Sequence, residues 1–476
     1  MASNHSHFAP GSPLYRTATL ILGAVLCPAN TQAARPPLVE PPYCETTVNP
    51  QGRPPLVKPP YCPPAGDMAP KLVSPRARAS GLPAISDNGR YIAYITNIVR
   101  QQGEQQRDQI FLWDAKQKNR HLISQDNDKD PDKQGEGNSL YPAINGDGSR
   151  VVYASDARDI DPDCADGKMN IYLRIWDQLK TADCISKSPV GVPAHGMSPS
   201  ISGDGLTVSW SGPFVTENNK DQTDIFVWTN PQGIRRVSLA SNGGSANGSS
   251  ESSSLDQSGQ RITFTSEASN LIAGDSNKHP DIFVRSLNPA QPELEQTALV
   301  SVGFNGEPAN DKSAGSTISR NGLVIAFVSA ATNLVTDDTN DKRDVFIRDL
   351  ADPAHPVTVR VSLSSDGKQA NGDSDVISLT ADGRCVAFQS DASNLAPEDK
   401  NASTDAYVHD RQTGRTERVS LKRNGREGND DSFFPSISAD GTTIAFTSTG
   451  TQLTRNSDHQ DNPDVYVVTL PDGLCH

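Results

Sequence analysis

Residues 316–319 (STIS), 324–329 (VIAFVS), 344–349 (DVFIRD) and 359–363 (VRVSL) are four short apolar or β-branched runs within the stretch Ser316–Leu363. A tight turn, Arg320-Asn321-Gly322, separates the first two runs, and longer polar segments separate the others. Short runs of this composition, bounded by Gly, Asn, Asp and Pro, are typical of β-strands joined by turns and loops. The stretch therefore predicts a unit of four consecutive strands.

The same unit recurs along the chain, and the glycine of its first turn measures the spacing. Successive glycines lie between 54 residues (Gly205 to Gly259) and 63 residues (Gly259 to Gly322) apart. The full set is Gly89, Gly148, Gly205, Gly259, Gly322, Gly383 and Gly441. The third strand also occurs seven times, at residues 109–112, 170–173, 224–227, 281–284, 344–347, 405–408 and 464–467. A period of this length with four strands in each copy is typical of a β-propeller.

The fourth strand is present only six times, and its last copy is Arg418–Leu421. The missing strand is expected at the other end of the chain, where Lys71-Leu72-Val73-Ser74 carries the same Val-Ser pair. A propeller must close into a ring or leave strand edges exposed. We therefore predict an all-β, seven-bladed β-propeller of four-stranded antiparallel blades, closed by an N-terminal strand that completes the last blade. The alternative is that residues 71–74 are a linker.

These repeats resemble the TolB-like group of WD40-type propellers. The resemblance rests on the strand and turn of residues 199–205 (PSISGDG) and 435–441 (PSISADG), and on the strand of residues 344–349. It covers roughly residues 71–470 and implies the fold rather than a function. TolB itself is similar to a six-bladed propeller behind a small α/β domain. This chain has seven repeats and no such domain, so the resemblance does not transfer TolB's own partners.

The composition of the sequence divides the chain into three segments. Residues 1–33 are typical of a secretory signal, with Arg16, the apolar run of residues 17–26 and an Ala-x-Ala-like site ending at Ala33. Residues 34–70 are rich in proline, which predicts an extended spacer or a ligand for a partner domain. Residues 71–476 are predicted to form the propeller. The signal indicates a periplasmic or secreted protein; lipidation of Cys27 stays open, and no transmembrane segment is expected.

Cysteine usage agrees with export. After removal of Cys27, an even number of cysteines remains, and this is typical of disulfide-bonded exported proteins. The local pairs are Cys44 with Cys62 and Cys164 with Cys184. Cys385 lies in a predicted strand, where we expect a buried thiol.

The charge of the chain restricts its partners. The formal net charge is −14 at pH 7, which argues against nucleic acid or an anionic membrane as a partner. The expected partner is a protein or glycan of the cell envelope or exterior, and the expected state is a monomer.

Two polar patterns recur in the loops that follow the second and fourth strands. The first is Asp-x-Asn-x-x-x-Asp, in which Ca²⁺ would find oxygen ligands at alternating positions. Its members are Asp275, Asn277 and Asp281; Asp338, Asn340 and Asp344; and Asp399, Asn401 and Asp405. Side chains that bond to the loop backbone would explain the same pattern. The second pattern, Gly-x-x-Ala/Gly-Asn, ends at Asn247, Asn310, Asn371 and Asn429 and predicts a structural turn.

The sequence contains none of the catalytic motifs that are recognisable by spacing. It has no Gly-x-Ser-x-Gly, no His-Glu-x-x-His and no phosphate-binding Gly-x-x-x-x-Gly-Lys. The leading hypothesis is an exported non-enzymatic propeller. It binds its partner through the long-loop face, the face of the ring that carries the long loops after the second and fourth strands. The alternative is an enzyme, a lyase or hydrolase, with its site at the mouth of the central channel. A converging cluster of His, Arg and carboxylates there would favour the enzyme, and neutral Ser, Thr and Ala would favour binding.

Overall fold

We describe the protein from a computed structural model that covers residues 68–75, 78–98, 106–126, 135–178, 182–187, 195–213, 222–454 and 462–476. The chain divides into two units, Met1–Cys62 and Pro63–His476, and all of the described residues belong to the second. The predicted signal, the proline-rich segment, Cys44 and Cys62 lie outside the described residues. No helix among the described residues is long and apolar enough to cross a membrane.

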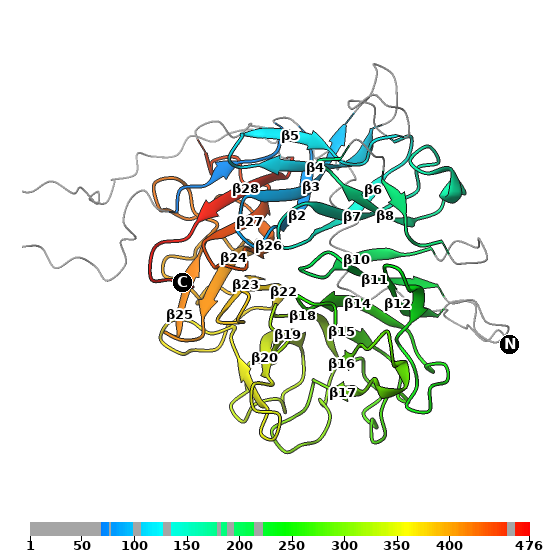
Figure 1. Ribbon diagram of the computed structural model, residues 1–476. Helices are drawn as coiled ribbons and strands as arrows, with labels where there is room; N and C mark the ends of the chain where they lie inside the picture. Colours follow the sequence, from blue (N-terminus) through cyan, green and yellow to red (C-terminus); the bar gives the residue numbers. More distant parts are fainter. Residues whose placement is uncertain are drawn as a thin grey trace, which may run out of the picture. The chain divides into compact units, whose positions relative to one another are not determined.

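Seven four-stranded antiparallel sheets form a ring, which confirms the predicted propeller (Figure 1). Blade 1 contains β2 (Ser80–Ile85), β3 (Tyr91–Ile98), β4 (Arg107–Asp114) and β5 (Asn119–Leu122). Blade 2 contains β6 (Ser139–Ile144), β7 (Arg150–Ser155), β8 (Asn170–Ile175) and β9 (Asp183–Cys184). Blade 3 contains β10 (Met197–Ile201), β11 (Thr207–Pro213), β12 (Thr223–Thr229) and β13 (Gly233–Arg236).

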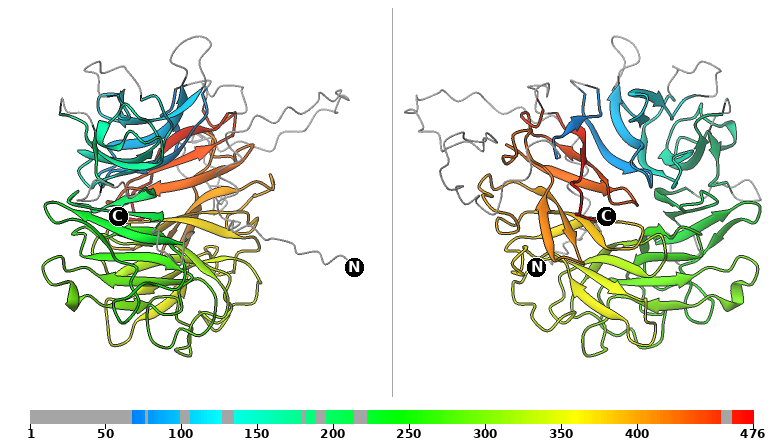
Figure 2. Two further views of the ribbon diagram at one scale, coloured as in Figure 1. Left: turned by 90° about the vertical axis from the view of Figure 1, so that its right-hand side faces the viewer. Right: turned by 60° about the vertical axis from the view of Figure 1, so that its left-hand side comes forward.

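The remaining blades repeat this arrangement (Figure 2). Blade 4 contains β14 (Ser250–Leu255), β15 (Arg261–Ser266), β16 (Asp281–Ser286) and β17 (Thr297–Leu299). Blade 5 contains β18 (Ser313–Ile318), β19 (Val324–Ser329), β20 (Asp344–Asp349) and β21 (Val357–Arg360). Blade 6 contains β22 (Ser374–Leu379), β23 (Cys385–Ser390), β24 (Asp405–Asp410) and β25 (Arg415–Arg418). Blade 7 contains β26 (Ser432–Ile437), β27 (Thr443–Ser448), β28 (Asp464–Thr469) and the N-terminal β1 (Lys71–Leu72). The short 3-10 helices η1 (Pro162–Cys164) and η2 (Pro292–Leu294) lie in loops.

The hydrophobic core lies between the blades, where seven clusters of buried side chains join each blade to the next. Inside every blade, an aromatic residue of the second strand lies beside one of the third. The pair Phe327 and Phe346 has ring centroids 5.9 Å apart. Burying large aromatic pairs is strongly stabilising, and it explains how short strands with low overall apolar content form one domain.

The N-terminal strand completes blade 7, as predicted. Lys71 lies opposite Val467, and Leu72 lies opposite Tyr466. The Val73 backbone N–H then donates to the Val465 carbonyl at 2.8 Å, and the Ser74 hydroxyl donates to Asp464 at 2.6 Å. The first residues of the propeller and nearly the last are thus paired in one sheet.

Two disulfides join described residues. Cys164 and Cys184 are bonded with their Cα atoms 6.3 Å apart, which confirms that predicted pair. Cys385 is bonded to Cys475, with a Cα separation of 5.5 Å. The expectation of a free buried thiol at Cys385 was therefore wrong. The C-terminal tail returns past blade 7 to the second strand of blade 6, and this return places Cys475 beside Cys385.

Every first strand contains an irregularity in its pairing with the second strand. The residue at this point has positive φ in all seven blades, and only Gly315 suits that conformation intrinsically. The others are Leu82, Tyr141, Ser198, Ser252, Val376 and Phe434. A bulge of this kind bends the strand locally and is often found beside functional sites.

Candidate functional site

Antiparallel connectivity sorts the connections onto two faces of the ring. The short turns between first and second strands lie on one face, and the loops that follow second and fourth strands lie on the other, here called the long-loop face. On this face an asparagine in the loop before the first strand forms hydrogen bonds with the loop that follows the second strand of the same blade. Asn310 accepts a hydrogen bond from the Thr332 backbone N–H at 2.9 Å and donates to the Thr332 hydroxyl at 3.0 Å. Asn247 and Asn371 repeat this arrangement, which confirms the structural reading of Gly-x-x-Ala/Gly-Asn.

The last Asp of the proposed calcium pattern has a structural role in each of the three blades that contain the pattern. It is the first residue of the third strand, and its carboxylate accepts a hydrogen bond from a serine that follows the fourth strand. Ser301 donates to Asp281 at 2.5 Å, and Ser420 donates to Asp405 at 2.5 Å. The same serine accepts the backbone N–H of the next residue, as Ser301 does from Ile282. We call this pair the Asp–Ser clasp; Asn170 and Gln109 replace the Asp in blades 2 and 1.

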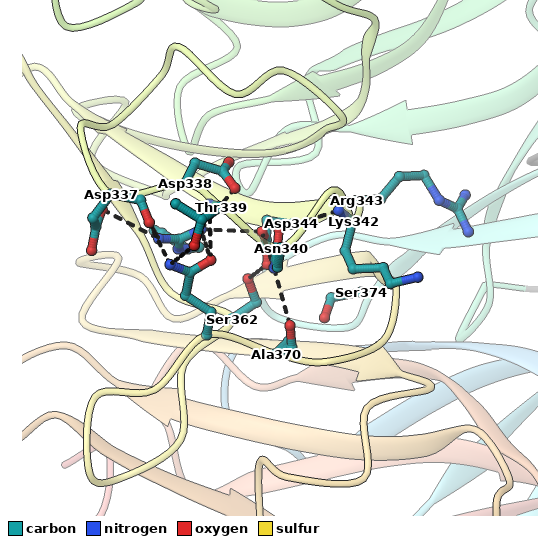
Figure 3. Close-up of polar contacts among 12 residues, drawn as sticks. Asp337, Asp338, Thr339, Asn340, Lys342, Arg343, Asp344, Ser362, Ala370 and Ser374 are labelled. Atoms are coloured by element: carbon teal, nitrogen blue, oxygen red, sulfur yellow. Dashed lines mark hydrogen bonds and ion pairs between the residues drawn. The ribbon is translucent and has the colours of Figure 1, made fainter.

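The middle Asn of the pattern forms a hydrogen bond with the loop that follows the fourth strand of its blade. In blade 5, the Asn340 amide donates to Asp344 at 2.8 Å and to the Ala370 carbonyl at 3.0 Å (Figure 3). Its side-chain oxygen accepts the Lys342 backbone N–H at 3.2 Å. Asn277 makes the equivalent bonds in blade 4. The structure thus brings each predicted triple together within its own blade.

The main positive partner of these carboxylates in blade 5 is Arg360, which sequence reasoning missed. Its guanidinium lies 3.1 Å from Asp338, 3.3 Å from Asp344 and 3.2 Å from Asp337, and only 2% of its side chain is exposed. Lys342 and Arg343 belong to the same loop, but their side chains point away from the cluster (Figure 3). A signal was available, because Arg360 stands two residues before the clasp serine Ser362, and alternate residues of a strand share a face.

Blade 6 repeats the arrangement, again with three carboxylates around one buried arginine. Arg418 lies 3.0 Å from Asp405, 3.6 Å from Asp399 and 3.3 Å from Glu427. The Tyr407 hydroxyl also donates to Asp399 at 2.7 Å. Burial raises the pKa of Asp405 to about 6 and raises the pKa of Asp399, although the arginine opposes both shifts. Glu427 and Tyr407 were not singled out in the sequence.

Blade 4 differs because it has Leu299 where Arg360 and Arg418 stand in the other two blades. Among the described residues no lysine or arginine is ion-paired with Asp275 or Asp281. Burial raises the pKa of Asp281 to about 6 and also raises the pKa of Asp275. Ser301 and Asn277 supply the hydrogen bonds that partly offset the shift at Asp281.

These contacts decide how well each triple fits calcium. In blades 5 and 6 a guanidinium already lies among the carboxylates, so an added cation would have to displace it. Among the described residues of blade 4 the carboxylates have no such partner, and the Asn277 amide donates to Asp281 and to the Ala309 carbonyl. In blade 6, carboxylate oxygens of Asp399, Asp405 and Glu427 lie within 4.8 Å of one another, but Arg418 pairs with all three. Calcium binding stays a prediction, and the absence of such a charge makes the blade 4 loop the better candidate.

The central channel contains a cavity of about 170 Å³ on the side of the short turns. The first strands contribute one small residue and one aliphatic residue each, such as Ser200 and Ile201. Among the described residues that line the cavity, only Asp87 and Arg320 are ionisable, and they form an ion pair at 2.6 Å. Asp87 belongs to blade 1 and Arg320 to blade 5, so the pair reaches across the ring.

Backbone hydrogen bonds join the short turns of neighbouring blades in a closed circuit. They run from Asp87 to Gly146, Gly146 to Gly203, Asp204 to Gln257, Gln257 to Arg320, Asn321 to Ala381, Ala381 to Ala439 and Asp440 to Asp87, with N–O distances of 2.9 to 3.3 Å. This circuit and the Asp87–Arg320 pair narrow the channel on the short-turn face. Approach to the cavity is therefore expected from the long-loop face.

No family model matches the chain, and no curated protein matches it. Among solved structures, it is similar to a putative TolB from Agrobacterium tumefaciens, with 13% identity over 84% of this chain and 94% of that one, at a TM-score of 0.36. The propeller domain of the Trilobed protease from Pyrococcus furiosus matches with 11% identity over 83% and 96%, at 0.49. A puromycin-hydrolyzing peptidase from Mycobacterium tuberculosis matches with 12% identity over 79% and 50%, at 0.47. No TM-score here reaches 0.5, so these likenesses carry no functional argument.

Proposed function

We propose that the chain is an exported, non-enzymatic propeller that binds a protein or glycan of the cell envelope or exterior through its long-loop face, as a monomer. The observation that carries this proposal is the internal pairing of the charged groups there in blades 5 and 6. The guanidinium groups of Arg360 and Arg418 are almost fully buried against the loop carboxylates. Charges used in this way hold the loops in one shape and leave their polar tips for recognition.

The channel supports the same proposal. Its described cavity is lined by Ser, Thr, Ala, Ile and Leu apart from one ion pair. General acid–base catalysis needs a titratable group held near the reacting atoms, and Asp87 is already paired with Arg320. Export is supported by the signal-like sequence and by the two disulfides, because disulfides persist in oxidising compartments.

Two exposed apolar residues on opposite faces provide a matched test. Phe304 is 62% exposed in the loop before β18 on the long-loop face, and Leu206 is 51% exposed in the short turn between β10 and β11. The mature protein is immobilised and used to capture partners from an envelope extract. We expect Phe304→Ser to reduce capture of the main partner and Leu206→Ser to leave it unchanged. Equal capture by both variants would place recognition elsewhere and contradict the long-loop face.

A further inference from the structure

Backbone polar groups of the first strands point into the cavity on the ring axis. In each blade the last residue of the first strand, such as Ile85, Ile144 or Ile201, forms a non-hydrogen-bonded pair with the second strand. The next residue along forms the hydrogen-bonded pair, as when the Asn145 N–H donates to the Arg150 carbonyl. In a non-hydrogen-bonded antiparallel pair, both the N–H and the C=O point away from the partner strand. Here they point toward the channel, because the first strands are innermost.

Serines satisfy this inward N–H in three blades. The Leu255 N–H donates to Ser200 of the preceding blade at 3.2 Å, and the Ile318 N–H donates to Ser254 at 3.4 Å. The Ile437 N–H donates to Ser378 at 3.1 Å. In each case the hydroxyl belongs to the next-to-last residue of one first strand. It accepts a hydrogen bond from the inward N–H of the first strand in the following blade.

Two consecutive blades lack this hydroxyl. The residues that correspond to Ser200 are Ala84 in blade 1 and Ala143 in blade 2, so neither can accept a hydrogen bond from Ile144 or Ile201. No acceptor for these two N–H groups is found among the described residues, although both residues are buried. The equivalent N–H groups of Ile85 and Leu379 also have no acceptor among the described residues, although Ser436 and Thr317 carry hydroxyls at the corresponding positions. Buried backbone N–H groups without a partner are rare in folded proteins, so an acceptor from outside the chain is expected.

We propose that this cavity binds a small, neutral, polyhydroxylated molecule. Hydroxyl groups both accept and donate, so they can satisfy the inward N–H groups and the inward carbonyls of the same residues. A carboxylate could accept only, and the one guanidinium of the lining is already paired with Asp87. The volume of about 170 Å³ far exceeds the roughly 10–15 Å³ that one water needs. This site lies apart from the loop tips and does not depend on the partner proposed for them.

The chain itself supplies the variants for the test. Ala143→Ser places a hydroxyl where Ser200 has one, so it should satisfy the Ile201 N–H from within. Losing one such hydrogen bond to the ligand should weaken binding by about three- to tenfold. Ala84→Ser should act in the same way through the Ile144 N–H. Ser200→Ala is the matched control, because it opens a further N–H at Leu255 and should not weaken binding.

The experiment follows the backbone amide signals of Ile144 and Ile201 by NMR in the mature protein while glucose, glycerol or acetate is added. We expect saturable shifts with glucose or glycerol, no shift with acetate, and weaker binding in Ala143→Ser and Ala84→Ser. A response to acetate alone, or no saturable response to either polyol, would overturn the proposal, the second outcome leaving a channel that holds only water. Equal weakening in Ser200→Ala would also overturn it.

Discussion

At the scale of single residues, the Asp–Ser clasp explains two sequence signals with one contact. The Val-Ser pair of the fourth strand and the Asp that opens the third strand both recur because the serine bonds to the carboxylate and to the next N–H. The repetition of both signals could be read from the sequence. Their mutual contact could not, because it depends on how the fourth strand is aligned with the third.

His409 is the residue whose protonation should most clearly affect stability. It is buried in β24 beside Thr416, and burial lowers its pKa to about 4. An unfolded imidazole titrates near about 6.5, so between these values the unfolded chain binds a proton that the folded chain does not. The stabilising contribution is therefore fully present above about pH 6.5 and is lost as the pH falls toward 4, by roughly 3 kcal/mol.

Blade 7 has Val468 at the position equivalent to His409, which suggests the variant His409→Val. We expect its free energy of unfolding, measured with denaturant from pH 4 to 7.5, to depend less on pH than that of the parent protein. The difference between the unfolding free energies of parent and variant cancels the contribution of the carboxyl groups, because these groups titrate in both proteins. His355→Val is the control, since His355 is 85% exposed. Identical pH profiles for parent and His409→Val would refute the assignment.

At the scale of the element, the loop after the second strand shows where prediction from sequence ended. The triples were found by their spacing, and each does gather within one blade. Arg360 and Arg418 were overlooked because they lie on the fourth strand, far along the chain from the Asp and Asn residues they contact. The bulge at Val376 was also unpredictable, because a β-branched residue strongly disfavours positive φ.

The difference between blades 4 and 5 makes the calcium prediction testable. If the blade 4 loop binds calcium, millimolar Ca²⁺ should raise the melting temperature above that measured with chelator, by mass action. Asp275→Asn should abolish this rise, whereas Asp338→Asn, next to Arg360, should not. The absence of any calcium-dependent shift in the parent protein would eliminate the metal and leave the loops with a structural role only.

Arg360→Leu copies the blade 4 residue into blade 5 and serves as a companion variant. Removing one partner of a buried ion pair typically costs about 3–5 kcal/mol, so we expect a marked loss of stability without calcium. A partial recovery in calcium would show that the carboxylates can accept a metal once the guanidinium is gone. An unchanged free energy of unfolding would contradict the stabilising role assigned to Arg360.

At the scale of the whole molecule, seven blades, their strand order and the ring closure all followed from the repeat and from one missing strand. The second disulfide did not, because Cys475 lies beyond the last strand and nothing in its spacing shows that the tail turns back to Cys385. A repeat predicts what is common to its copies. It predicts poorly what happens once, at the point where the two ends meet.

Ring closure should contribute measurably to stability. Deleting residues 71–75 exposes the edge of β28 and removes the serine partner of Asp464, so we expect a clearly lower melting temperature. Ser74→Ala is the milder variant; it leaves a buried carboxylate without its hydroxyl donor, which should cost about 1–3 kcal/mol. A deletion variant that melts at the parent temperature would mean that β1 does not hold the ring together.

The two disulfides should stabilise unequally. The loop closed by Cys385 and Cys475 has a sequence separation of 90 residues, against 20 for Cys164 and Cys184. In the chain-entropy view, longer loops give larger stabilisation, of about 3 to 5 kcal/mol over this range. We therefore expect the Cys385→Ser/Cys475→Ser pair to lose more unfolding free energy than the Cys164→Ser/Cys184→Ser pair. The reverse order would show that strain or local packing dominates.

Completion of blade 7 by β1 also sets an order of events during synthesis. Lys71 and Leu72 leave the ribosome before any blade exists, and their partners Val467 and Tyr466 are translated almost last. A nascent chain therefore carries an unpaired strand from its first blade to its seventh. A premature stop codon even shortly before residue 464 would leave that strand without a partner and Cys385 without Cys475. We expect the effects of truncating mutations in the gene to be all-or-none rather than graded with the length lost.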